Sequence, residues 1–130
     1  MSDIYKQKIV DHYKNPRNFK KLEDFTHKFK VENLSCGDSL EIWLRVDDSG
    51  TIEKASFEAD GCVITLASGS MLTEKLIGKT LKEVSNYDKN TIVDMLGIEL
   101  QPSRLKCALL SLEAAQKALS SSDSEIEQLN

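Results

Sequence analysis

The spacing of apolar residues predicts one helix and then three strands in the first half of the chain. Residues 3–14 place apolar side chains at helical intervals, and the Asn-Pro pair that follows ends this helix. Apolar and polar residues then alternate over residues 25–31, 40–46 and 52–59, which predicts three strands. The third stretch slips phase near Lys54, as a β-bulge would. Because the connections between the strands are short, we expect an antiparallel meander.

The second half of the chain has helical spacing instead. Its predicted helices cover residues 63–77, a short segment after position 80, a segment that ends at position 96, and residues 102–119. Thr80 and Glu83 fit a capping box, Asn90 is the expected N-cap of the next helix, and Gly78 and Gly97 are expected at helix ends. Strands followed by helices predict an α+β fold: a three-stranded antiparallel sheet packed against helices on one face.

Composition is typical of a single globular domain. The chain has 130 residues, of which 40% are hydrophobic and 29% charged, and its net charge is −4. We expect one domain over residues 1–119, in which residues 1–20 form a loosely docked N-terminal helix segment. Residues 120–130 are rich in serine and acidic side chains, which predicts a disordered tail.

Charge and apolar content argue against several classes of partner. The lysines of the basic N-terminal segment are scattered in an acidic chain, so we expect no nucleic-acid partner. No apolar run approaches the length of a membrane span, and the charged start is unlike a signal peptide, so we expect no membrane contact. Three cysteines in such a chain indicate a reducing compartment, and we expect a cytoplasmic protein.

The three cysteines fall at the ends of predicted elements. Cys36 lies in the loop between the first two strands, Cys62 lies where the third strand meets the long helix, and Cys107 lies in the first turns of the last helix. Helix N-termini favour thiolates, and three such ends can meet at one edge of a small α+β domain. A buried apolar position is the alternative for each cysteine. The Cys-Gly-Asp loop around Cys36 lacks the apolar periodicity for it, whereas Cys107 could face the core between Leu105 and Leu109. Spacing alone favours this alternative over a joint metal site.

Asp38 adds a fourth candidate ligand, because it follows Cys36 by two residues and Gly37 permits a tight turn between them. Three thiolates and one carboxylate can complete a tetrahedral set for Zn²⁺ or hold an iron–sulfur cluster. The carboxylate is the poorer match for a soft iron–sulfur centre, and this weakness would suit a site that gives its cluster away. Asp is also common in turns, which is the alternative interpretation.

Four segments together resemble the IscU/SufU/NifU-type family of iron–sulfur cluster assembly scaffolds. They are residues 10–18 (VDHYKNPRN; family H-Y-x-N-P-R-N), 33–38 (NLSCGD; N-P-x-C-G-D), 61–74 (GCVITLASGSMLTE; G-C-x-I-x-x-A-S-x-S) and 104–108 (RLKCA; R-x-K-C-A). The resemblance runs from about residue 3 to residue 119. It implies the α+β fold of IscU and SufE-like proteins.

The resemblance also implies a site and a function. Cys36, Asp38, Cys62 and Cys107 would hold a transient [2Fe–2S] cluster, or Zn²⁺ in the same place. A cysteine desulfurase would deliver sulfur, with Cys36 and Cys107 as candidate sulfur acceptors, and the cluster would pass to apo iron–sulfur proteins. Such a protein is a scaffold or carrier rather than an enzyme. The resemblance is also compatible with a homodimer that holds the cluster.

The chain departs from the family pattern at three places. Lys106 stands where many IscU-type members have His, and its ammonium has no lone pair for a metal, so we expect it to offset thiolate charge or to be solvated. Lys here is typical of SufU-like members, yet the SufU insertion between the second and third cysteines is missing. Residues 100–104 (LQPSR) replace the L-P-P-V-K that an Hsp70-type chaperone reads, which weakens the expectation of that partner.

Two further functions therefore remain as alternatives to the scaffold. One is a zinc-dependent sulfurtransferase of the SufU kind, which would use the same four residues. The other is a structural zinc-binding interaction module.

Several other residues have expected structural roles. We expect His12 to pack or cap, Tyr5 and Tyr13 to be core or interface aromatics, and Trp43 to lie on the solvent face of the second strand. Gly69 should allow close packing of a helix on the sheet.

Overall fold

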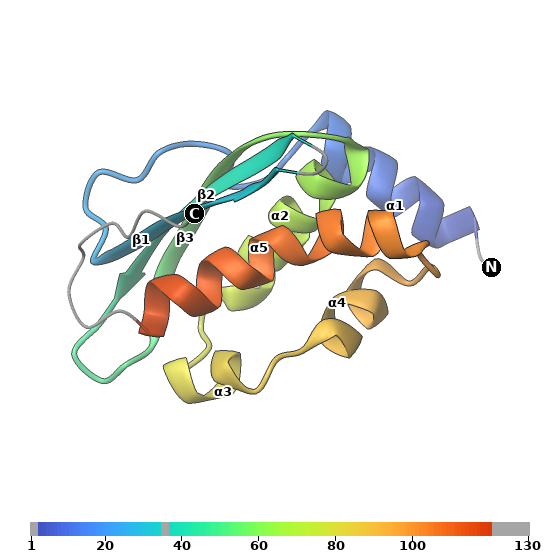
Figure 1. The fold of residues 1–130 in the computed structure, drawn as a ribbon. Coiled ribbons are helices and arrows are strands. Elements are labelled where there is room, and N and C mark those ends of the chain that lie inside the picture. The colour runs from blue at the N-terminus through green and yellow to red at the C-terminus, as the bar shows by residue number, and fades with distance from the viewer. Residues whose placement is uncertain (1–2, 35–36, 121–130) are drawn as a thin grey trace.

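The computed structural model describes residues 3–34 and 37–120. Cys36 and the predicted acidic tail from residue 121 therefore lie outside the described residues. The elements are α1 (Asp3–Lys14), β1 (His27–Asn33), β2 (Asp38–Val46), β3 (Ile52–Asp60), α2 (Val63–Leu76), α3 (Leu81–Ser85), α4 (Lys89–Leu96) and α5 (Pro102–Ser120) (Figure 1). Within the described residues, no helix is both long and apolar enough to cross a membrane.

The sheet is the predicted antiparallel meander, in the order β1-β2-β3. Its register places Phe29, Ile42 and Phe57 side by side on one face. The expected phase slip is also confirmed: Arg45 pairs with Lys54, but the next residue of β2 pairs with Ile52, so β3 contains one extra residue at this point.

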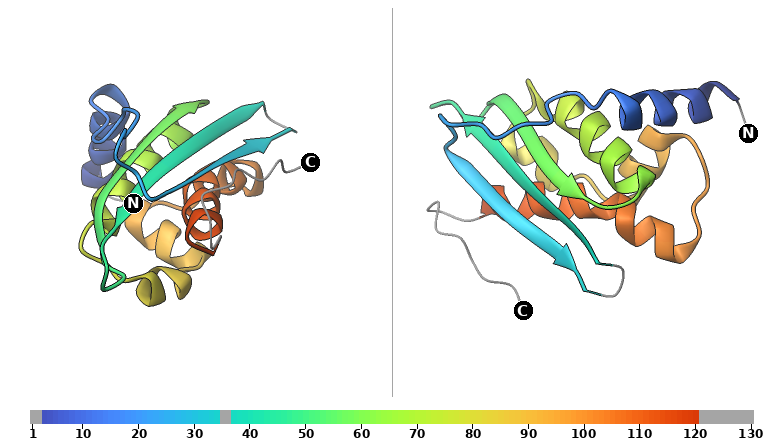
Figure 2. Two further views of the ribbon diagram at one scale, coloured as in Figure 1. Left: turned by 90° about the vertical axis from the view of Figure 1, so that its left-hand side faces the viewer. Right: turned by 90° about the horizontal axis from the view of Figure 1, so that it is seen from above.

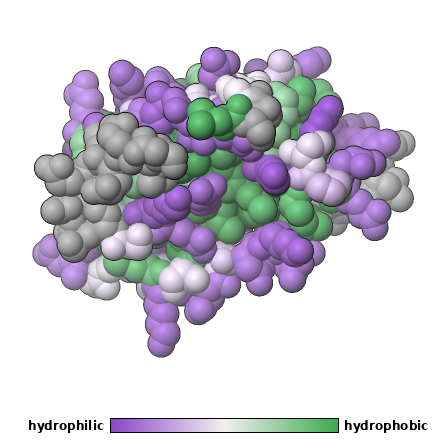
Figure 3. Space-filling view, viewed as in Figure 1, coloured by the Kyte–Doolittle hydropathy of each residue, from purple (hydrophilic) through white to green (hydrophobic). Residues whose placement is uncertain are grey.

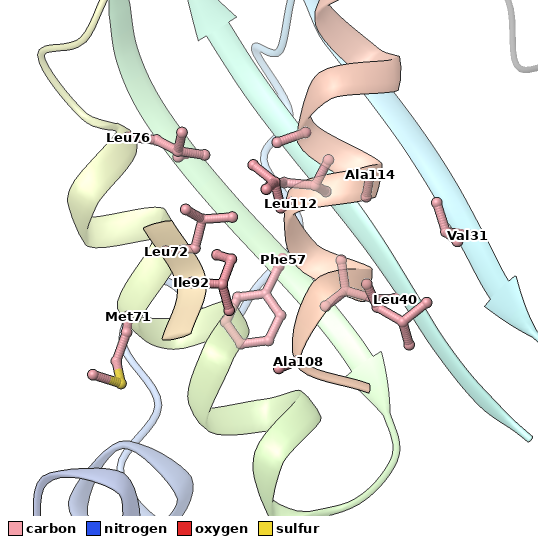
Figure 4. Close-up of a cluster of buried hydrophobic side chains, with 14 of the residues drawn as sticks. Val31, Leu40, Phe57, Met71, Leu72, Leu76, Ile92, Ala108, Leu112 and Ala114 are labelled. Atoms are coloured by element: carbon pink, nitrogen blue, oxygen red, sulfur yellow. The ribbon is translucent and has the colours of Figure 1, made fainter. Parts of the chain in front are cut away.

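The core lies between the sheet and the helices α2 and α5, which cover one face of it (Figures 1 and 2). The ring of Phe57 lies between these two helices, close to Leu72 and Ala108 (Figure 4). A Cβ at Gly69 would come within 2.5 Å of that ring, so the missing side chain permits the close approach that the sequence predicted. Burial of this apolar face is the main force that holds the two layers together.

The second face of the sheet is not open to solvent at Trp43, which corrects the sequence prediction. Trp43 is only 4% exposed. The chain leaves the edge of β3, where the Phe57 amide donates to Asn18, and must cross the sheet to begin β1 at the other edge (Figure 1). On the way, Asp24 bonds Arg45 through its carbonyl and Lys54 through its carboxylate. This crossing segment covers the face that alternation alone marked as exposed.

The N-terminal helix is tied to α2 by polar contacts. Ser70, buried in α2, bonds His12 Nδ1 at 2.7 Å and accepts a bond from the Arg17 amide at 2.8 Å. Asn18 Nδ2 donates to Thr73 in the same helix. His12 is buried, in agreement with a packing role. Residues of the segment that resembles H-Y-x-N-P-R-N thus dock α1 and the start of the crossing segment.

The two tyrosines of α1 differ in their surroundings. The ring of Tyr5 lies against Gly97, where a Cβ would clash with it, so Tyr5 packs at the end of α4. Both Tyr5 and Tyr13 nevertheless remain about 40% exposed. Figure 3 shows one mostly hydrophilic face of the molecule, with apolar surface gathered toward its middle, where α5 passes.

Helix ends follow the predicted chemistry with two shifts. The capping box of Thr80 and Glu83 begins α3, as expected. The N-cap of α4 is Asp88 rather than Asn90, because the Asp88 carboxylate accepts from the two amides that follow within the first turn. Gly97 ends α4 with a φ of 74°, whereas α2 stops at Leu76, one residue earlier than the sequence suggested.

Candidate metal centre

Three of the four predicted ligands meet at one end of the sheet. Asp38 is the first residue of β2, Cys62 is the N-cap of α2, and Cys107 lies in the second turn of α5. One ligand atom of each residue lies within 4.8 Å of those of the other two. The fourth predicted ligand, Cys36, lies outside the described residues but precedes Asp38 by only two positions. Helix packing on the sheet therefore joins residues that are far apart in the sequence.

Asp38 is buried and held by hydrogen bonds. Its Oδ2 accepts from the hydroxyl of Thr65 at 2.5 Å and from the amide of Cys62 at 3.4 Å. A Cβ at Gly61 would lie 2.7 Å from the carboxyl carbon, so this glycine leaves the space that the carboxylate occupies. A buried carboxylate with such partners keeps a fixed orientation toward the two thiols.

Cys62 has the environment of a reactive thiol. Burial raises the pKa of the Cys62 thiol, but hydrogen bonds with Thr65, with the Ile64 amide and with Cys107 outweigh it. The pKa consequently lies below its ordinary value. The position at the start of α2 contributes to this result, because free amides there point toward the sulfur. Cys62 is half-buried, whereas Cys107 is only 6% exposed.

Lys106 lies beside this cluster in the sequence but is exposed. Its side chain helps to line a groove between β1 and α5, together with Asn33, Leu34 and Leu109. The groove therefore reaches from the end of β1 to the helix that carries Cys107. A role of Lys106 in offsetting thiolate charge stays a prediction.

Sequence reasoning missed two residues of this site, Thr65 and Gly61. Thr65 lies three positions after Cys62, so the helical period already places it on the same side of the first turn of α2. Its bond to Asp38 joins residues 27 positions apart, and no local pattern predicts such a contact. Gly61 entered the sequence analysis only as the first residue of the 61–74 segment, whereas in the structure it makes room for the carboxylate.

The donor atoms suit a thiophilic metal. Two sulfurs and one carboxylate oxygen are three of the four ligands that tetrahedral Zn²⁺ requires, and thiolates also bind iron–sulfur clusters. The ligand atoms of the three residues lie within 4.8 Å of one another, and Thr65 holds the carboxylate, so the spacing and chemistry of the donors suit such a group. An α+β domain that brings one Asp from the start of its central strand and two Cys from the first turns of two helices together is thus a candidate metal- or cluster-binding domain.

The chain belongs to the family described as the NifU-like N-terminal domain, whose model it matches over residues 4–127. It is 36% identical to the iron–sulfur cluster assembly scaffold protein IscU of Haemophilus influenzae, over 88% of this chain and 92% of that one. It is 32% identical to the zinc-dependent sulfurtransferase SufU of Bacillus subtilis, over 92% and 91%. A similar crystal structure is a putative iron–sulfur cluster assembly scaffold protein for the SUF system of Fervidobacterium islandicum, with a TM-score of 0.75, 29% identity, and coverage of 90% of this chain and 97% of that one.

Proposed function

We propose that this protein is an iron–sulfur cluster assembly scaffold. The observation that carries the proposal is the convergence of Asp38, Cys62 and Cys107 at the end of the sheet where β2 begins, two positions after Cys36 in the sequence. The IscU relatives, which match nearly the whole chain, support the same conclusion. In this proposal Cys36 completes the ligand set, and a [2Fe–2S] cluster is the cargo that the four residues hold and release.

Sulfur reaches the scaffold by transfer from a persulfide to a thiolate. A thiolate of the scaffold attacks the outer sulfur of a persulfide on a cysteine desulfurase, the S–S bond of that persulfide breaks, and the desulfurase thiolate leaves. Cys36 and Cys107 are the proposed acceptors, and each transferred sulfur needs two electrons from a separate donor to become sulfide. The pKa of the neighbouring Cys62 thiol is lowered, which favours the thiolate that binds iron.

A second candidate function is zinc-dependent sulfur relay, which the SufU relative and the Lys before Cys107 both favour. The same four residues would hold Zn²⁺, and Cys36 would accept sulfur once a desulfurase displaces the metal. A scaffold exchanges its zinc for iron and sulfide, whereas the zinc of a relay protein resists replacement by iron and the protein accelerates the desulfurase. The two functions therefore differ in what stays in the site.

Anaerobic reconstitution separates them. The full chain is incubated with ferrous iron, cysteine, a cysteine desulfurase and a reductant, and acid-labile sulfide and transfer to an apo-ferredoxin are then measured. Stoichiometric labile sulfide that moves to the ferredoxin supports the scaffold. Retained zinc, no labile sulfide and a faster desulfurase support the relay. A structural zinc module would show neither labile sulfide nor a faster desulfurase.

A further inference from the structure

Thr65 is a buried threonine that touches two of the proposed ligands. It is fully buried in the first turn of α2, and its hydroxyl oxygen lies 2.5 Å from Asp38 Oδ2 and 3.7 Å from Cys62 Sγ. A buried hydroxyl that loses its partner costs free energy, so these contacts define the orientation of the Thr65 side chain.

The proton of the Thr65 hydroxyl goes to the carboxylate. A hydroxyl has a single hydrogen to donate, and a carboxylate oxygen at 2.5 Å is nearer and a stronger acceptor than a sulfur at 3.7 Å. The hydroxyl can still accept from the Cys62 thiol, but that contact ends when the thiol loses its proton to bind metal. The bond to Asp38 persists in both states.

The other side of the carboxylate is bounded by backbone. Gly61 lies so close that a Cβ there would touch both the carboxyl carbon and Oδ2, and the Cys62 amide donates to the same oxygen. Engagement of Oδ2 by two donors fixes rotation of the carboxylate about its Cβ–Cγ bond. The direction in which Asp38 presents its oxygens to the two sulfurs is then set by α2 and not by β2 alone.

We propose that Thr65 is the positioning residue of this centre, which holds Asp38 in the orientation that a metal requires. The proposal rests on the proposed function only in that Asp38 is taken as a metal ligand. Hydrogen-bond partners that orient metal ligands contribute about 10–100-fold to metal affinity in other sites. We expect Thr65 to contribute to metal affinity by a factor in the same range, and we expect this contribution to act entirely through Asp38.

Cobalt(II) binding tests the proposal, because thiolate-to-cobalt charge-transfer absorption reports the sulfur ligands directly. The full reduced chain is titrated anaerobically with Co²⁺ in competition with a chelator. The variants are Thr65→Val, which removes the hydroxyl at nearly constant volume, Thr65→Ser, which keeps it, and Thr65→Ala, which replaces Thr65→Val if that variant does not fold. The matched control is Thr73→Val, a buried threonine of the same helix whose hydroxyl donates to the Ser70 carbonyl.

The expected result is about 10–100-fold weaker Co²⁺ binding by Thr65→Val, near-native binding by Thr65→Ser and by the control, and no further loss when Thr65→Val is added to Asp38→Ala. Native affinity in Thr65→Val would overturn the proposal. An equal loss in the Asp38→Ala background would also overturn it, since Thr65 would then act through Cys62 or packing. A parent chain without the charge-transfer band would refute the metal centre itself, and the proposed function with it.

Discussion

In the proposed ligand set, Asp38 is the single oxygen donor and the other members are cysteines. Carboxylates bind iron–sulfur clusters less well than thiolates, because the cluster irons prefer soft ligands. Hydrogen bonds from Thr65 and from the Cys62 amide orient this carboxylate. In the proposed function, the preference of the cluster irons for sulfur makes Asp38 the ligand from which release would begin.

Replacement of Asp38 should therefore slow cluster release. We expect Asp38→Ala to give a cluster that persists longer and transfers to an apo-ferredoxin on the order of tenfold more slowly. The measurement is the transfer rate after anaerobic reconstitution, followed by the absorption of the cluster. Asp60→Ala is the matched control, because Asp60 is an exposed carboxylate at the end of the neighbouring strand. A transfer rate that does not change in Asp38→Ala would contradict this role.

His12 gives a second prediction for a single residue, since its ring is buried against Ser70. Burial lowers the pKa of His12, and Arg17 lowers it further, while Glu74 and Asp11 act in the opposite direction. The folded state thus prefers the neutral ring. The neutral His12 ring contributes fully to stability above about pH 6.5, the usual pKa of a histidine in an unfolded chain. This contribution declines as the pH falls toward the lower pKa of the folded state.

The test is urea unfolding between pH 7.5 and 5.5. We expect the free energy of unfolding of the parent chain to fall with acidification, and we expect a smaller fall in His12→Gln. Carboxylates with lowered pKa, such as Asp11 and Asp24, titrate below this window and do not interfere. His27 also has a pKa lowered by burial, so part of the dependence will remain in the variant. Equal slopes in the two proteins would show that His12 does not contribute.

At the scale of elements, the sequence predicted the helices and strands whose positions follow from the local periodicity of apolar residues. The strands and the long helices lie within two residues of where alternation and helical spacing placed them, because each buries one face against the same core. The largest shift is in β1, which was predicted over residues 25–31 and spans His27–Asn33. The N-cap of α4 was wrong by two residues, since Asp88 and Asn90 are both good caps and only the backbone direction decides between them. Burial of Trp43 depends on a segment that crosses the sheet, and alternation within a strand carries no information about it.

The difference between these two caps is measurable. Asp88→Ala should destabilise the protein by about 1 kcal/mol, because it leaves two amides of the first turn of α4 without their acceptor. Asn90→Ala, at an exposed position inside the same turn, should change the free energy of unfolding by less than about 0.5 kcal/mol. Chemical denaturation of both variants gives the comparison. A larger effect of Asn90→Ala would show that Asn90, as the sequence suggested, is the N-cap of α4.

At the scale of the whole molecule, the centre joins parts of the chain that are distant in sequence. Its described ligands come from the start of β2, the start of α2 and the second turn of α5, so a bound metal would connect the sheet to both helices that cover it. The motifs identified these residues, but only packing of α2 and α5 on one face brings them together. Sequence analysis did not identify Thr65, because its partner Asp38 lies on another element and only packing brings the two residues together.

A metal held in this way must stabilise the fold, because it binds the folded chain through three elements at once. Zinc at about 100 times its dissociation constant should add about 2.7 kcal/mol, which corresponds to a rise in Tm on the order of 10 °C. This is an upper value, since the reduced cysteines of the unfolded chain also bind zinc. Thermal unfolding with zinc and with a chelator measures the shift. Cys107→Ser should lose most of it and Asp60→Ala should keep it; a shift that survives in Cys107→Ser would place the stabilising zinc outside this centre.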